Sequence, residues 1–265
     1  MIRVVNVTQH YGIKPVLKQI SLEIPASSRT AVIGPNGMGK TTFLSVLAGV
    51  LQPQSGYVEI EGLRRRSSVE NERTIRKRAV FLPDRCFLPK NRTGREFLLG
   101  VGQMYELDRE RIVHHAESLL KLFDLAALAD SPIRTYSAGQ MKKISLCSAL
   151  ITDAHVLLLD EPFSGGLDPA GILALKHVLR RLSLERGRTV VLTSPVPELV
   201  VEVADRLIVI EKGRVSINGT LEELKRETGH TGSMNQMLHE VIFPETLVNI
   251  DAYFAEEDNL AGGSL

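Results

Sequence analysis

The sequence predicts an α/β fold with a mixed sheet, and three features carry that prediction. Short apolar runs without alternation, typical of strands buried on both faces, lie at residues 30–34, 79–82, 156–162 and 189–193. Segments with helical spacing stand between these runs. A glycine-rich segment joins the first run directly to a predicted helix at 41–47.

That glycine-rich segment has the pattern G-x-x-x-x-G-K-T, which is typical of a phosphate-binding loop. Glycines let successive backbone N–H groups turn inward, and the following helix adds its positive dipole end. In this pattern Lys40 reaches the β- and γ-phosphates and the Thr41 hydroxyl ligates Mg²⁺. The predicted phosphate-binding residues of the loop are Gly34, Pro35, Asn36, Gly37, Met38, Gly39, Lys40, Thr41 and Thr42.

Composition limits the other classes of function. The chain has 265 residues and a formal net charge of +1, so bulk charge does not indicate a nucleic-acid partner. Its two cysteines, Cys86 and Cys147, lie far apart and indicate no disulfide framework, which fits a reducing cytosol. We expect no signal peptide, because the N-terminus lacks a basic region followed by an apolar one, and no membrane span, because no apolar run approaches about 18 residues.

The remaining pattern predicts two accessory parts. Alternating residues at 2–8 and 16–24, with a further strand at 57–60, predict an antiparallel β subdomain. Helical spacing over roughly 93–129 predicts an inserted helical subdomain. Later in the chain we expect helices at 137–151, 170–186, 199–203 and 221–227 and a β-hairpin at 206–217.

Two features have alternative interpretations. Tyr11, just upstream of the phosphate loop, either stacks on a purine base or packs at a strand end, and position alone does not decide. The basic run at 64–78 either forms a solvated charged face or contacts anionic lipid headgroups; Glu70 and Glu72 interrupt it and favour the solvated face.

The strand at 156–162 ends in two carboxylates, Asp160 and Glu161. In open α/β sheets, ligands bind at the carboxyl ends of the strands. A buried strand that ends in two acids places negative charge in a cleft that needs a cation.

From about residue 2 to about residue 227 the chain resembles the ATP-binding subunit of an ABC transporter. Tyr136-Ser137-Ala138-Gly139-Gln140 resembles the signature motif of that family, with Ala138 where the first of two glycines is usual. Asp160-Glu161 resembles the Walker B pair, and Gly165-Gly166-Leu167-Asp168 resembles the D-loop.

The resemblance implies a role for each motif. Tyr11 would stack on adenine, with Val16 beside the base. Asp160 would bind Mg²⁺ alongside Thr41, and Glu161 would accept a proton from, or orient, the attacking water. Such subunits form head-to-tail homodimers or heterodimers, in which the signature helix of one subunit covers the ATP of the other. The signature residues that would serve the partner's ATP are Ser137, Ala138, Gly139 and Gln140.

Two positions depart from the family pattern. Asp84 stands at the Q-loop position, where glutamine is usual, and its carboxylate can still contact Mg²⁺ or its water. Pro195 stands at the H-loop position, where the family has a histidine that contacts the γ-phosphate; proline has neither a side-chain donor nor a backbone N–H. We expect Pro195 to begin the following helix, with Ser194 as its cap.

The sequence therefore predicts residues 1–84 and 141–228 as a nucleotide-binding core and 85–140 as a helical and signature subdomain. Residues 229–265 lose the pattern of regular elements, so we expect an extension there, with its last ten residues disordered. The predicted function is ATP hydrolysis that drives transport through a separate membrane permease, at the cytoplasmic face of the membrane, with a layout more similar to exporter subunits. The alternatives are a degenerate subunit with slow hydrolysis and a soluble ABC protein of DNA repair or translation.

Overall fold

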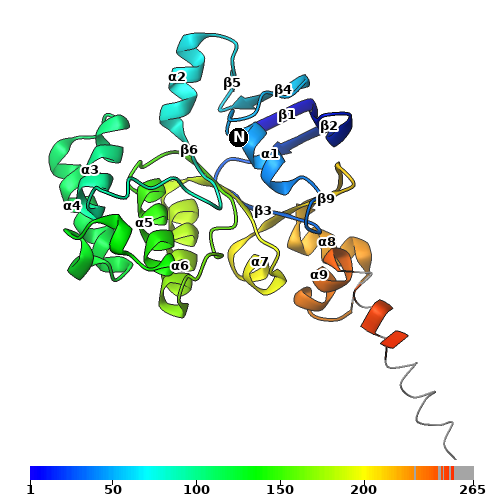
Figure 1. Ribbon diagram of the computed structural model, residues 1–265. Helices are drawn as coiled ribbons and strands as arrows, with labels where there is room; N and C mark the ends of the chain where they lie inside the picture. Colours follow the sequence, from blue (N-terminus) through cyan, green and yellow to red (C-terminus); the bar gives the residue numbers. More distant parts are fainter. Residues whose placement is uncertain (230, 244–245, 247, 251, 254–265) are drawn as a thin grey trace, which may run out of the picture.

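The computed structural model describes residues 1–229, 231–243, 246, 248–250 and 252–253, and within them the strands form two sheets (Figure 1). The antiparallel sheet has four strands in the order β2-β1-β4-β5, and the second sheet has six strands in the order β10-β9-β3-β8-β7-β6. In the second sheet β9, β3, β8, β7 and β6 run parallel, and β10 pairs antiparallel with β9. The predicted α/β fold with a mixed sheet and a separate antiparallel sheet is confirmed.

The elements have the following bounds. The strands are β1 (Ile2–Tyr11), β2 (Lys14–Ile24), β3 (Arg29–Ile33), β4 (Ser55–Ile60), β5 (Leu63–Arg64), β6 (Ala79–Leu82), β7 (Val156–Leu159), β8 (Thr189–Thr193), β9 (Arg206–Glu211) and β10 (Arg214–Thr220). The α-helices are α1 (Lys40–Leu47), α2 (Val69–Arg78), α3 (Gly94–Met104), α4 (Arg109–Leu122), α5 (Ala138–Leu150), α6 (Pro169–Arg186), α7 (Pro197–Val203), α8 (Leu221–Thr228) and α9 (Met234–Ile242).

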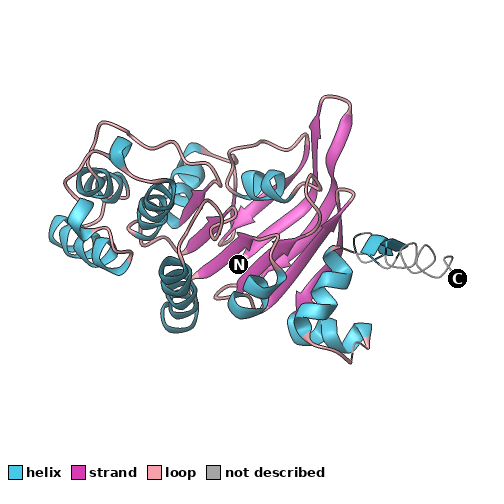
Figure 2. Cartoon of the chain, turned by 60° about the horizontal axis from the view of Figure 1, so that its bottom comes forward, coloured by secondary structure: helices cyan, strands magenta, loops and turns pink. Residues whose placement is uncertain are grey.

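The six-stranded sheet is buried on both faces, because successive residues of its inner strands enter different apolar clusters. Val190 and Leu192 of β8 pack with helices α3 to α6, whereas Val191 packs with α1 and the antiparallel sheet. Figure 2 shows helices on both sides of the strands. The loops at the carboxyl ends of β3, β7 and β8 therefore meet at one edge between these layers.

Two helices were not predicted. Helix α2 buries only Ile75, so its sequence shows no apolar period. The sequence features that favour a helix there are Ser68 at the N-cap, acidic residues in the first turn and basic residues in the last turn. The prediction that the pattern is lost after residue 229 is wrong for α9, which Ser233 caps and which buries Met237, Leu238 and Ile242. The predicted disordered tail, 256–265, lies outside the described residues.

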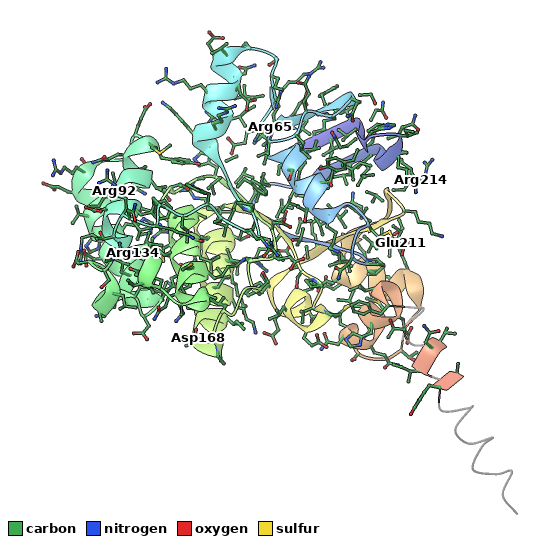
Figure 3. The ribbon with its side chains drawn as sticks, viewed as in Figure 1. Arg65, Arg92, Arg134, Asp168, Glu211 and Arg214 are labelled. Atoms are coloured by element: carbon green, nitrogen blue, oxygen red, sulfur yellow. The ribbon has the colours of Figure 1, made fainter. Side chains whose placement is uncertain are left out.

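The basic run at 64–78 is not uniformly solvated. Arg65 is buried; its Nε donates to the carbonyl of Leu47 at 2.6 Å, and its guanidinium pairs with Glu72 at 2.9 Å (Figure 3). Arg64 lies 4.0 Å above the ring of Tyr57. The prediction of a charged face in water is therefore wrong for Arg65, which closes the end of α1. None of the described helices combines the length and the apolar character that a membrane span requires.

Candidate nucleotide-binding site

The loop between β3 and α1 has a backbone that only glycine accommodates at two of its positions. Gly34 has a φ of 143°, and a Cβ there would lie 2.3 Å from the carbonyl oxygen of Ile210 in β9. Gly39, the residue before α1, is left-handed with a φ of 102°. The loop therefore packs closely against β9 of the sheet, and residues at the N-terminus of α1 line the cavity described below.

Lys40 is held inside the loop. Its side chain is buried, and Nζ donates to the carbonyl oxygens of Gly34 at 2.8 Å and Pro35 at 3.1 Å. Burial lowers the pKa of Lys40, and the nearby carboxylates of Glu161 and Asp160 oppose that shift. A phosphate in the loop would supply the negative charge that favours the protonated amine.

Thr41 and Asp160 meet, as expected of two ligands of one cation. Thr41 Oγ1 donates to Asp160 Oδ1 at 3.2 Å, and Thr193 Oγ1 donates to the same oxygen at 2.7 Å. Asp160 is only 1% exposed. Mg²⁺ binds proteins through one or two oxygen ligands and completes its shell with water and substrate phosphates, so the hydroxyl and carboxylate fit it. Among the described residues, no group of three or more His, Cys, Asp or Glu side chains is arranged so that it could hold a metal ion by itself.

Glu161 follows Asp160 in a left-handed conformation, with a φ of 44°. Its N–H donates to Thr193 Oγ1 at 2.8 Å, so one hydroxyl holds both acidic residues. Burial, with smaller contributions from Asp84 and Asp160, raises the pKa of Glu161, and Lys40 and Lys142 oppose that shift. A raised pKa makes the carboxylate a better proton acceptor.

A cavity of about 450 Å³ brings part of the predicted site together; Gly34, Pro35, Met38 and Asp160 do not line it. Tyr11 lies at the end of β1 and is 56% exposed, and Val16 lies in β2. Both reach the loop from the antiparallel sheet, whose first two strands precede the loop in the sequence. The residues that line the cavity are Tyr11, Val16, Asn36, Gly37, Gly39, Lys40, Thr41, Thr42 and Glu161.

The segment 137–140 opens α5 and contacts the loop after Glu161. Ser137 caps the helix in a capping box with Gln140. Gly139 approaches the carbonyl of Gly166 so closely that a Cβ would lie 2.5 Å from its oxygen. Asp168, labelled in Figure 3, caps α6 by accepting from the N–H of Gly171 at 2.8 Å, and it pairs with Lys143 at 2.9 Å.

Asp84 lies beside the same loop, after β6. Its Oδ1 accepts a hydrogen bond from Ser164 Oγ at 2.7 Å and lies 3.6 Å from Lys142 Nζ. Of the three predicted metal ligands, the structure thus brings Thr41 and Asp160 into contact and holds Asp84 with Ser164 and Lys142.

A family model described as "ABC transporter" matches residues 17–164, which is more than half of the chain. The chain belongs to the ABC transporter family. It is 37% identical over 221 residues to the daunorubicin resistance ATP-binding protein DrrA3 of Streptomyces coeruleorubidus, covering 83% of this chain and 68% of that protein. It is 35% identical over 227 residues to the sulfate/thiosulfate import ATP-binding protein CysA 2 of Shewanella oneidensis, covering 84% and 63% of the two chains.

Solved structures agree with this assignment. The ATP-binding subunit of an ABC transporter superposes with a TM-score of 0.83 at 25% identity, covering 91% of this chain and 99% of that one. The dimeric cassette MJ0796 bound to ADP and Pi superposes with a TM-score of 0.75 at 25% identity, covering 83% and 98%. This chain is accordingly an ATP-binding subunit of the ABC transporter family, with the fold of an ABC ATPase.

At the H-loop position the structure corrects one prediction. Helix α7 begins at Pro197, with Val196 as the preceding cap residue, and Pro195 lies outside it. Ser194 Oγ accepts from the N–H of Val196 at 3.1 Å and so caps no helical N–H. Both prolines suit a first helical position, but Val196 precedes Pro197, which disfavours the helical region there; Val196 is extended, with φ −105° and ψ 106°, so the helix begins only at Pro197.

Three contacts of this ABC ATPase were not foreseen from its sequence. Thr193 joins Asp160 to Glu161, and Lys142 and Ser164 join Asp84 to the same loop. Threonine at the end of a buried strand is ordinary for a β-branched residue, so its pattern did not distinguish it. A lysine inside a helix is equally ordinary unless its burial is known.

Proposed function

We propose that this chain binds ATP–Mg²⁺ and hydrolyses it as one half of a head-to-tail dimer, in which two subunits drive a separate membrane permease. The observation that carries the proposal is the single cavity shared by Tyr11, Val16, the phosphate loop and Glu161. Glu161, a carboxylate that can accept a proton, lies at one wall of the cavity, and the N–H and ammonium groups that bind phosphate lie at another. This arrangement suits attack by water on the terminal phosphate.

Each residue has a separate role in this reaction. Lys40 and the backbone N–H groups at the start of α1 bind the phosphates, and Tyr11 with Val16 holds the base. Thr41 and Asp160 hold Mg²⁺, which neutralises phosphate charge when it is bound. Glu161 takes a proton from the attacking water, and Ser137, Ala138, Gly139 and Gln140 close the site of the partner subunit from the N-terminus of α5.

Lys40→Ala tests nucleotide binding. Loss of the charge-assisted contact to phosphate is expected to cost about 2–3 kcal/mol, or roughly 30- to 150-fold in Kd. Calorimetric titration with ATP–Mg²⁺ measures this change. Lys212→Ala, on the exposed hairpin between β9 and β10, is the control and should bind as the parent does. Unchanged affinity in the Lys40 variant would contradict the assignment.

The proposed permease contact lies around the loop that follows Asp84. Phe87 in that loop is 97% exposed. We assign to the same contact a cavity of about 830 Å³ between α2 and the end of α3, which is lined in part by Val69 and Met104, 81% and 79% exposed. Exposed apolar side chains around a hollow are typical of a protein interface. Arg73 and Lys77, which pair with Glu106, line the same cavity and suit a partner segment with polar flanks.

Phe87→Ala is expected to weaken capture of the membrane subunit roughly 10- to 150-fold, because burial of one phenylalanine contributes about 1.5–3 kcal/mol. ATP cleavage by the isolated chain should not change. Detergent-solubilised membrane subunit, titrated onto immobilised chain, provides the measurement. Leu184→Ala, at a 64% exposed position in α6, is the control, and an equal effect of both variants would contradict this surface.

We further propose export as the direction. A relative 37% identical is named for daunorubicin resistance, and one 34% identical, from Rhizobium meliloti, is named for Nod factor export. The sulfate/thiosulfate import relative at 35% identity represents the opposite direction. Inside-out vesicles that carry the chain with its permease are expected to accumulate the transported compound when ATP is added outside, whereas an importer would empty them.

A further inference from the structure

Two consecutive lysines of α5, Lys142 and Lys143, have side chains only 6% and 7% exposed. Lysine is rarely buried unless it is paired, because desolvation of the ammonium is costly. The two side chains reach different ends of the loop that connects β7 to α6. Lys143 pairs with Asp168 at the far end, 2.9 Å away, and Lys142 reaches the near end at Glu161.

Lys142 joins three segments of the chain. Its Nζ donates to the carbonyl oxygen of Glu161 at 2.9 Å, and it lies 3.4 Å from Ser164 Oγ and from the carbonyl oxygen of Asp84. An ammonium has three protons, so it can serve all three oxygens. The helix that opens with the signature motif is thereby bonded to the main chain of Glu161.

Ser164 completes the cluster. Its Oγ lies 2.7 Å from Asp84 Oδ1 and 2.9 Å from the carbonyl oxygen of Glu161. The hydroxyl has a single proton, which it can give to only one of these oxygens at a time. When Ser164 gives its proton to Asp84, the carbonyl oxygen of Glu161 receives its hydrogen bond from Lys142 alone.

Charge links Lys142 to Asp84. The Asp84 carboxylate lies 3.6 Å from Lys142 Nζ and is 42% exposed. A glutamine at position 84 could still bond to Ser164, but it could not neutralise a buried ammonium. The acid at the Q-loop position and the lysine in α5 therefore belong together as a pair.

We propose that Lys142 is a positioning residue for Glu161 and that Asp84 is its counter-ion, so that the pair fixes the main chain of the base and ties it to the signature helix. This inference rests on the proposed role of Glu161. It gives the acid at position 84 a task of its own, which is to hold Lys142 against the carbonyl of Glu161. Since α5 begins with the residues that face the partner's ATP, the pair also connects the two ATP sites of the dimer.

The test is single-turnover cleavage of γ-labelled ATP by the purified full chain, with ATP affinity measured in parallel. Lys142→Met is expected to slow cleavage about a hundredfold, as a misplacement near 1 Å does, and to change the Kd for ATP less than threefold. Lys142→Arg should restore most of the rate. A cleavage rate within threefold of the parent in Lys142→Met overturns the proposal.

Asp84→Asn gives a second, independent arm, because residue 84 is partly exposed and the variant is expected to fold. Asp84→Asn alone should slow cleavage about tenfold. In the Lys142→Met background it should have little further effect, as expected of two residues that act together. Lys143→Met is the matched control, because its partner is Asp168 and not Asp84. In the double variant Lys143→Met, Asp84→Asn, the fold-change in rate should equal the product of the fold-changes of the two single variants. An unchanged rate in Asp84→Asn, or independent effects of positions 84 and 142, overturns the proposal.

Glu161→Gln in the same series separates this inference from the proposed function. If Glu161→Gln stops cleavage and Lys142→Met does not slow it, the role of Glu161 stands and the positioning role fails. If Glu161→Gln cleaves as the parent does, the role of Glu161 itself is wrong.

Discussion

Glu161→Gln is expected to lower the rate of ATP cleavage by about 10²–10⁴-fold while leaving ATP binding intact. The amide has the shape of the acid, and the N–H of residue 161 still donates to Thr193. It cannot accept a proton from water at the wall of the cavity. ATP should therefore hold two subunits together without being cleaved, because the phosphate loop of one and the signature helix of the other remain intact.

Size-exclusion chromatography with ATP–Mg²⁺ should show a stable dimer for this variant and a lower dimer fraction for the parent. Glu211→Gln makes the same chemical change on the exposed hairpin labelled in Figure 3 and should behave as the parent. A Glu161→Gln protein that stays monomeric, beside a parent that hydrolyses ATP, would show that Glu161 is not the base or that the chain does not form homodimers.

The phosphate loop could be predicted from sequence because its geometry is local. Gly34, Gly39 and Lys40 lie within a few residues of one strand and one helix, so their spacing determines the backbone. The buried strands were equally visible, since β7 is apolar throughout and β8 is apolar at its three central positions. The contact of Thr41 with Asp160 was expected only from the resemblance, because it joins the start of α1 to the residue after β7, far apart in the sequence.

Features that depend on packing between distant segments were not visible. No residue near Arg65 in the sequence indicates that its guanidinium will bond to the carbonyl of Leu47 at the end of α1. No residue near Lys142 indicates that it will be buried against Asp84. Both residues look like solvated charges until the fold removes the water around them. Helix α9 differs, because Ser233 followed by apolar residues at 234, 237, 238 and 242 was readable as a capped amphipathic helix.

Pro195→His is expected to raise the rate of ATP cleavage by the homodimer by about 10²–10³-fold, the usual effect of one preorganised donor at a transition state. Position 195 directly follows Ser194 at the end of β8, two residues beyond Thr193, whose hydroxyl contacts both Asp160 and Glu161. The resemblance implies that a histidine at this position contacts the terminal phosphate, and we expect the introduced side chain to do the same. Because α7 begins only at Pro197, the exchange does not remove the first residue of a helix.

Pro195→Ala is the matched control, since it restores the backbone N–H and frees the main chain without adding an imidazole. ATP affinity should be unchanged in all three proteins, and only the histidine variant should turn over faster. In a heterodimer whose other subunit carries the histidine, the active site would be the one covered by the segment Tyr136 to Gln140 of this chain. If the parent already hydrolyses ATP at the rate of the histidine variant, or if alanine gives the same gain, residue 195 does not limit catalysis and the slow-hydrolysis alternative is wrong.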